Sequence, residues 1–173
     1  MKKLLIALLV AISGIAQAQN MSEKEVTPEL VTLRETQKKE VISYYLALRD
    51  NFLNSDSLLA VKNAKALITS FSKFKFKKLT LEKMNEATTT RKEIVALATA
   101  IAATKNINKQ RKAFSALSTK FWAIADKLKP ADMPLYQQVC PMTGDIWLSE
   151  SKDIKNPYYP KNMLTCGEVK ASL

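Results

Sequence analysis

The chain has 173 residues, of which 47% are hydrophobic and 25% charged, and its formal net charge is +11. This composition is typical of a globular protein and excludes disordered and collagen-like chains. The sequence contains no histidine, which excludes a Ser-His-Asp triad, a zinc site with histidine ligands and a haem held by histidine. Its two cysteines are too few for an iron–sulfur cluster held by four thiolates.

Residues 1–18 have the pattern of a secretory signal peptide. Lys2 and Lys3 precede the short apolar run Leu4–Ile12, and Ala16-Gln17-Ala18 matches an A-x-A cleavage site. An uncleaved anchor helix is the alternative, but a helix that spans a bilayer needs about 20 apolar residues. We therefore expect cleavage near Ala18/Gln19 and an exported, periplasmic protein that has no transmembrane segment after cleavage.

The next part of the chain, residues 19–129, is expected to be helical. Between residues 29 and 129 there is neither glycine nor proline, although hairpins and sandwiches need such turn residues at short intervals. Apolar residues recur at helical spacing in four segments, separated by breaks at residues 54–56, 73–78 and 106–108.

These segments predict an all-α fold, an antiparallel four-helix up-down bundle joined by short links. Asn54 or Ser55 is expected to cap the second helix, and Thr90 with Glu93 forms a capping-box pattern in the third segment. Residues 130–173 hold five of the six prolines and both cysteines, so this tail is expected to form a loop-rich cap packed on the bundle, in one domain with it.

The sulfur atoms of the tail are the strongest functional signal in the sequence. In Cys140-Pro141-Met142 the proline favours an extended backbone, which places both sulfurs on one side. Met163 and Cys166 are three residues apart and would share a face of a helical turn. Two thiolates and two thioethers form a soft site that suits Cu(I), whereas thioethers are not usual zinc ligands. The predicted metal ligands are therefore Cys140, Met142, Met163 and Cys166.

A structural disulfide is the alternative for the same cysteines. A Cys140–Cys166 bond would close a loop of about 25 residues and stabilise the fold by about 3 kcal/mol. The protein would then be a structural or partner-binding exported domain. Neither interpretation involves an organic cofactor, and no acid–base or nucleophile–base pair is recognisable, so we expect a binding protein and not an enzyme.

The tail also carries four short blocks: Cys140-Pro141-Met142, Trp147-Leu148-Ser149, Asn156-Pro157-Tyr158 and Met163-Leu164-Thr165-Cys166-Gly167. In this combination it resembles an exported domain of unknown function common in Bacteroidota. That domain occurs alone or appended to periplasmic adaptor subunits of heavy-metal efflux pumps. The resemblance implies copper or a related soft metal at the four sulfurs, and an efflux pump or a copper chaperone as partner.

Basic and aromatic residues alternate between Lys73 and Lys78, with Phe74 and Phe76 between the lysines. Nucleic acid is not expected as a partner of an exported protein. A solvated link between helices is the simplest interpretation, and weak binding to an anionic surface is the alternative.

Overall fold

The computed structural model describes residues 27–77 and 79–173, so the expected signal peptide lies outside the described residues. Within these ranges four long helices come first: α1 (Pro28–Leu53), α2 (Ser57–Lys73), α3 (Leu81–Ala102) and α4 (Ile107–Ala123). A short helix, α5 (Ala125–Leu128), leads into three strands, β1 (Tyr136–Val139), β2 (Ile146–Ser149) and β3 (Glu168–Ser172). None of the helices described here is long and apolar enough to cross a membrane.

Each long helix begins at a side chain that accepts hydrogen bonds from the unpaired backbone N–H groups of its first turn. The four capping residues are Thr27, Asp56, Thr80 and Asn106. Asp56 caps α2 in place of the expected Asn54 or Ser55, and its carboxylate accepts two N–H groups at 3.1 and 2.8 Å. Because α3 begins directly after Thr80, Thr90 lies inside the helix and does not cap it.

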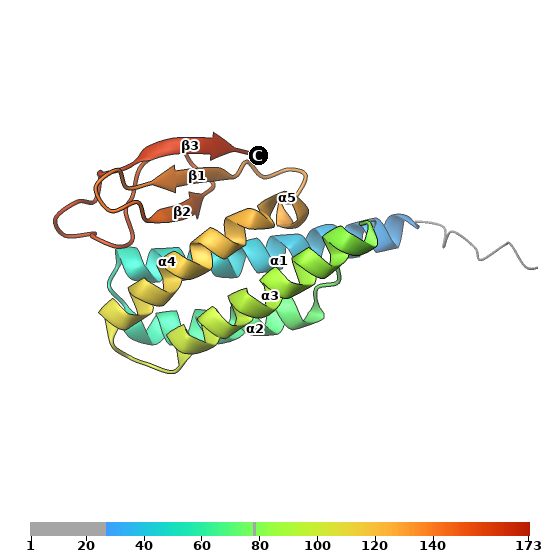
Figure 1. The fold of residues 1–173 in the computed structure, drawn as a ribbon, viewed down its shortest axis with the longest axis horizontal. Coiled ribbons are helices and arrows are strands. Elements are labelled where there is room, and N and C mark those ends of the chain that lie inside the picture. The colour runs from blue at the N-terminus through green and yellow to red at the C-terminus, as the bar shows by residue number, and fades with distance from the viewer. Residues whose placement is uncertain (1–26, 78) are drawn as a thin grey trace, which may run out of the picture.

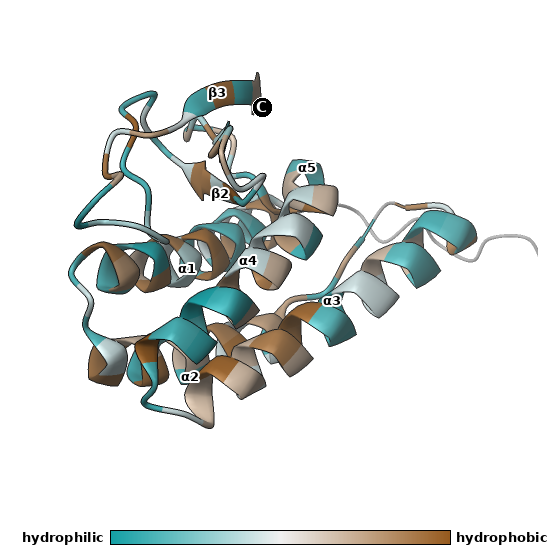
Figure 2. Ribbon diagram, turned by 60° about the vertical axis from the view of Figure 1, so that its left-hand side comes forward, coloured by the Kyte–Doolittle hydropathy of each residue, from teal (hydrophilic) through white to brown (hydrophobic). Residues whose placement is uncertain are grey.

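The apolar faces of the long helices meet in one core. Teal and brown segments alternate along α1 to α4 in Figure 2, as expected of helices with one apolar face. Consecutive helices pack against each other, and the centre of the core is aromatic. The ring of Tyr45 lies 4.4 Å from that of Phe121 and 5.3 Å from that of Phe114, which lies 4.9 Å from the ring of Phe52.

The prediction of an all-α fold with a loop-rich cap is wrong. The tail contains a three-stranded antiparallel sheet with the strand order β2-β1-β3. The strands have only four or five residues, too few for a period of two to stand out from the sequence. The prolines and glycines that argue against a long helix lie outside these strands, where turn residues normally end strands. Pro130 and Pro134 precede β1, and Pro141, Gly144, Pro157, Pro160 and Gly167 lie between the strands.

The molecule has three layers (Figure 1). The sheet covers α1 and α4, and α2 and α3 lie on the other side of that helix pair.

The strand nearest the helices is β2, whose outer edge would present unpaired backbone groups. Helix α1 satisfies one of them, because the Tyr45 hydroxyl accepts the N–H of Leu148 at 3.0 Å and bonds Ser118 Oγ at 2.7 Å. The Tyr158 hydroxyl donates to the carbonyl of Ile146 at 2.6 Å.

Candidate functional site

The first thiol is positioned by the hairpin between β1 and β2. Cys140 directly follows β1, and its N–H donates to the carbonyl of Asp145 at 2.9 Å, while its own carbonyl accepts the N–H of Gly144 at 2.8 Å. Gly144 has a φ of +74°, in the left-handed region that glycine adopts without strain. The turn therefore holds Cys140 at one end of the sheet, with its side chain buried.

The second thiol is positioned by the loop before β3. The buried Asn156 side chain donates to the carbonyl of Cys166 at 3.1 Å and accepts the N–H of Tyr158 at 2.9 Å. Gly167 follows Cys166 and lies against the indole of Trp147, so close that a Cβ at this position would be 2.8 Å from the ring. Asn156 and Trp147 therefore fix the backbone at the Cys166 carbonyl and at the residue that follows it.

Trp147 is itself held by a buried polar contact. Its indole N–H donates to Gln138 Oε1 at 2.6 Å. The amide nitrogen of Gln138 donates in turn to the carbonyls of Ser151 and Asp153, at 2.9 and 3.2 Å. The Gln138 side chain thus connects β1, the indole and the loop after β2, and every polar atom of that amide has a partner.

These loops bring the two cysteines together. Cys140 Sγ and Cys166 Sγ lie 3.6 Å apart, longer than a disulfide bond of about 2.05 Å and within contact distance for two thiols. Cys140 is buried and Cys166 is partly buried, and both are free cysteines.

The two thiols differ in acidity. Burial raises the pKa of Cys140, but contacts with the Thr143 side chain, with the backbone N–H groups of Met142 and Thr143, and with the Cys166 thiol together bring the pKa below its ordinary value of 9.0. The hydrogen bond to Cys140 raises the pKa of Cys166, and desolvation raises it further. Cys140 is therefore the first of the pair to become a thiolate, and Cys166 keeps its proton and donates it to that thiolate.

The predicted thioethers lie near this pair in sequence but are less enclosed. The side chain of Met142 is 74% exposed, although its backbone N–H is directed at both thiols. Met163 is partly buried, and its carbonyl accepts the Cys166 N–H at 3.0 Å. Within residues 27–77 and 79–173 neither methionine sulfur makes a hydrogen-bonding contact with a thiol, so the structure brings together two of the four predicted sulfurs.

Thr143 and Asn156 contribute to the site although the sequence did not single them out as site residues. Asn156-Pro157 is a typical turn-initiating dipeptide, and an asparagine in that position commonly bonds the backbone two residues on, as it does here with Tyr158. Thr143 belongs to the turn that follows Cys140, and a threonine hydroxyl in a turn commonly accepts a nearby backbone N–H, as Thr143 does here from Asp145. Both turn patterns can be recognised from neighbouring residues, but neither pattern by itself shows which cysteine the side chain lies beside.

A comparison with known families finds one match. The family described as "Protein of unknown function (DUF3347)" matches residues 41–132, which extend from the middle of α1 to just before β1. No curated protein and no solved structure is detectably similar to the chain.

Proposed function

The chain belongs to the DUF3347 family, and we propose that it is an exported protein that binds a soft metal ion, Cu(I), through Cys140 and Cys166. The observation that carries the proposal is the 3.6 Å separation of the two sulfurs. Metal–sulfur bonds of about 2.3 Å allow one ion to contact two sulfurs at this separation. Both sulfurs belong to loops whose backbones are held in place by other buried groups.

The donor set favours Cu(I) over zinc. A structural zinc site uses four nitrogen, sulfur or oxygen ligands. In the described part of the chain no three histidine, cysteine, aspartate or glutamate side chains lie close enough together to hold a metal ion. Two thiolates, with thioethers as the remaining donors, suit the soft Cu(I) ion.

The surroundings of one predicted ligand, Cys140, lower the pKa of its thiol. A thiolate is the form that binds metal, and hydrogen bonds around Cys140 favour it. Cys166 must lose the proton that it donates to Cys140, so uptake of the ion releases protons and strengthens as the pH rises. The bound ion would take over the role of that proton in holding the two sulfurs together.

Met142 and Met163 are proposed as the thioether donors. Met142 is adjacent to the pair through its backbone, and its exposed side chain is free to change rotamer. Met163 belongs to the same turn as Cys166.

The proposal of export depends on the signal-peptide pattern of residues 1–18, and the role in copper or heavy-metal efflux depends on the resemblance of the four tail blocks. Those blocks lie outside residues 41–132.

A disulfide-stapled structural domain is the second candidate. The same contact supports it, because the sulfurs of the two free thiols face each other 3.6 Å apart. Formation of the bond would release two protons and pass two electrons to an oxidant of the exporting compartment. The two candidates exclude each other at any one moment, since an oxidised pair has no thiolate left for a metal.

The experiment is a titration of the anaerobically reduced protein with Cu(I), in competition with a chromophoric Cu(I) chelator. Wild type is expected to bind one ion, and Cys140→Ser and Cys166→Ser to lose tight binding. Met142→Leu and Met163→Leu are expected to weaken it, with a stability cost below about 1.5 kcal/mol because Met and Leu have similar volumes. Met133→Leu, a partly buried methionine outside the predicted ligand set, is the matched control and should bind like wild type.

The disulfide candidate gives the opposite pattern. Reduced wild type would then bind no Cu(I), both methionine variants would match wild type, and either cysteine variant would lose stability under oxidising conditions without any metal. A count of free thiols before and after reduction identifies which state the purified protein is in.

A further inference from the structure

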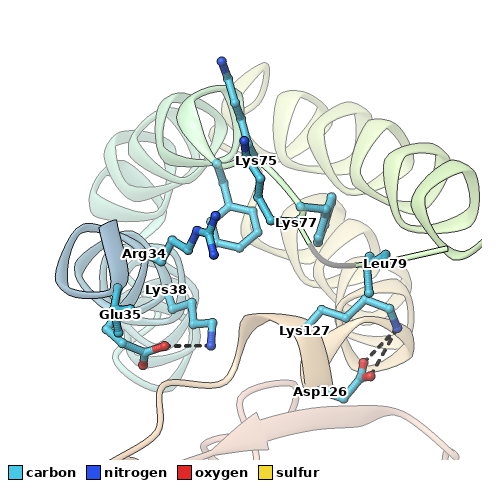
Figure 3. A pocket seen from close by; sticks show the side chains of 11 residues that line it. Arg34, Glu35, Lys38, Lys75, Lys77, Leu79, Asp126 and Lys127 are labelled. Atoms are coloured by element: carbon cyan, nitrogen blue, oxygen red, sulfur yellow. Dashed lines mark hydrogen bonds and ion pairs between the residues drawn. The ribbon is translucent and has the colours of Figure 1, made fainter. Parts of the chain in front are cut away.

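A basic pocket lies at the end of the helical layers farthest from the thiol pair. It has a volume of about 420 Å³ and is formed by one face of α1, the link between α2 and α3, and α5. The lining residues include Arg34 and Lys38 from α1, Lys75 and Lys77 from the link and Lys127 from α5, and in Figure 3 the Lys75 side chain extends outward from the link. In Figure 1 the start of α1 lies at the right-hand end of the molecule and α5 lies to the right of the sheet, whereas β1, which precedes Cys140, ends toward the left.

The backbone of the link places its lysines around this space. Residues 74–77 are extended, so successive side chains alternate between two sides. Phe74 and Phe76 are only 5% and 7% exposed, with their rings 5.2 Å apart and edge to face. Arg91 donates to the carbonyl of Phe74 at 2.9 Å. The buried rings and this hydrogen bond anchor the link, and the exposed Lys75 and Lys77 leave it toward solvent, although atoms of all four residues line the pocket.

Both carboxylates of the pocket already have cationic partners. Glu35 accepts Lys38 Nζ at 2.8 Å and the N–H of Ala131 at 2.9 Å, and these two hydrogen bonds lower its pKa. Asp126 pairs with Lys127 at 3.1 Å. The lining residues carry five positive charges against two negative ones, so an excess of three remains.

The excess charge belongs to three side chains. Arg34, Lys75 and Lys77 form no ion pair with any residue in 27–77 or 79–173. Three cations around one cavity repel each other, and an anion in that cavity would remove the repulsion. Arginine offers a planar fork suited to a phosphate group, and lysine adds point charges that turn toward it.

We propose that this pocket binds a phosphate ester, with the phosphate between Arg34, Lys75 and Lys77. The remaining lining is apolar, from Val31, Phe74, Phe76 and Leu79, and it would cover the carbon part of the ligand. A volume of about 420 Å³ exceeds what a single inorganic ion needs and lies within the range of small-molecule sites. The site is separate from the thiol pair and does not depend on the proposed metal function.

Two sources could provide this chemistry, a soluble ester or the headgroup of an anionic lipid. sn-Glycerol 3-phosphate is therefore tested by isothermal titration calorimetry, and vesicles of phosphatidylglycerol are tested by co-sedimentation, with phosphatidylcholine vesicles as the uncharged reference. Binding of either probe supports the pocket, and the probe that binds identifies the source.

The variants decide whether this pocket is responsible. The double variant Lys75→Glu/Lys77→Glu is expected to weaken binding by at least about tenfold, and Arg34→Gln by about fivefold, given roughly one kcal/mol per basic residue at an anionic surface. The matched control, Lys62→Glu/Lys65→Glu, changes the net charge equally at two exposed positions of α2 outside the pocket, and it should bind like wild type.

Three results would overturn the proposal. They are binding of neither probe, equal loss in the control double variant, and undiminished binding in both pocket variants. Circular dichroism of each variant confirms folding, and Arg34→Gln remains informative if the double variant does not fold, because Arg34 is partly exposed and outside the buried link.

Discussion

The helical part of the molecule and its strand-containing part are held together by different contacts. The helices share a continuous apolar core, and among the largest fully buried side chains of the described residues only Trp147 lies outside them. The strand-containing part has one such side chain and a few buried polar ones, notably Gln138 in β1 and Asn156 in the loop between β2 and β3. The apolar core distributes its stability over many side chains, whereas the strand-containing part depends on a few specific contacts.

This difference matters for the thiol pair, because Cys140 and Cys166 both belong to the strand-containing part. Their separation depends on the indole of Trp147, on the Asn156 side chain and on the turn at Gly144. Substitutions there should alter both stability and the site, whereas substitutions in the helices should alter stability alone.

Trp147→Ala is expected to have the largest effect, about 3 to 5 kcal/mol of unfolding free energy. It removes the main apolar side chain of the sheet and leaves the Gln138 carbonyl oxygen without its donor. Urea unfolding followed by circular dichroism measures the change. Trp122→Ala, on α4 and only partly buried, serves as the control. A loss as large as that of Trp147→Ala would contradict the dependence of the sheet on one side chain.

Gly167→Ala is expected to cost about 2 to 3 kcal/mol and to disturb the thiol pair. The added methyl group would lie 2.8 Å from Ile154 Cγ2 and 2.8 Å from the Trp147 ring. Thermal unfolding gives the cost, and the rate of reaction with a thiol reagent reports on Cys166. Gly144→Asn is the comparison, because asparagine tolerates a positive φ and nothing lies within 4 Å of the new Cβ. A Gly167→Ala protein with wild-type stability and wild-type thiol reactivity would show that Trp147 and Ile154 move easily to make room for the methyl group.

Tyr45→Phe is expected to cost about 1 to 2 kcal/mol, because the buried N–H of Leu148 would lose its acceptor. Burial raises the pKa of Tyr45 to about 12, so the hydroxyl stays protonated and the effect should be constant from pH 6 to pH 9. Chemical unfolding at several pH values measures it. Tyr44→Phe, on the same helix and partly exposed, should leave the unfolding free energy nearly unchanged. A similar cost for both variants would mean that the hydrogen bond between Tyr45 and Leu148 does not contribute to stability.

The smallest expected effect, below about 1 kcal/mol, comes from the ion pair between Arg49 and Glu150, which are 2.8 Å apart. Desolvation raises the pKa of Glu150, but the hydrogen bond from Arg49, the Glu150 backbone N–H and the charges of Arg49 and Lys155 together lower the pKa below 4.5. A group whose folded pKa is lowered stabilises the protein above its unfolded pKa, and this contribution is lost as the pH falls below about 4.5.

Glu150→Gln should therefore reduce stability at pH 7 and flatten its decline between pH 5 and pH 3, as measured by urea unfolding across that range. The exposed Glu86, which has no hydrogen-bonding partner among the described residues, provides the control Glu86→Gln, with a wild-type profile. An unchanged profile for Glu150→Gln would show that this pair contributes nothing to the contact between α1 and the end of β2.

The helices could be predicted because their evidence is local. Val41, Tyr45, Leu48 and Phe52 recur at helical spacing in the sequence and are all fully buried in α1, since a helix places residues three and four apart on one face whatever it packs against. The sequence also predicted that the sulfurs of Cys140 and Cys166 lie together, from the C-x-M and M-x-x-C spacings and because these are its two cysteines, and the two sulfurs are 3.6 Å apart.

The sheet was decided by the tertiary structure. β1 pairs with β3 more than 25 residues further along the chain, and strands of four or five residues have too little pattern to reveal such a partner. The same holds for the basic pocket: the alternation of Lys75 and Lys77 with two phenylalanines is visible in the sequence, but Arg34 and Lys127 reach that space only because α1 and α5 pack beside the link. Local spacing determines which face of a segment is apolar, and only packing determines which distant side chains share a cavity.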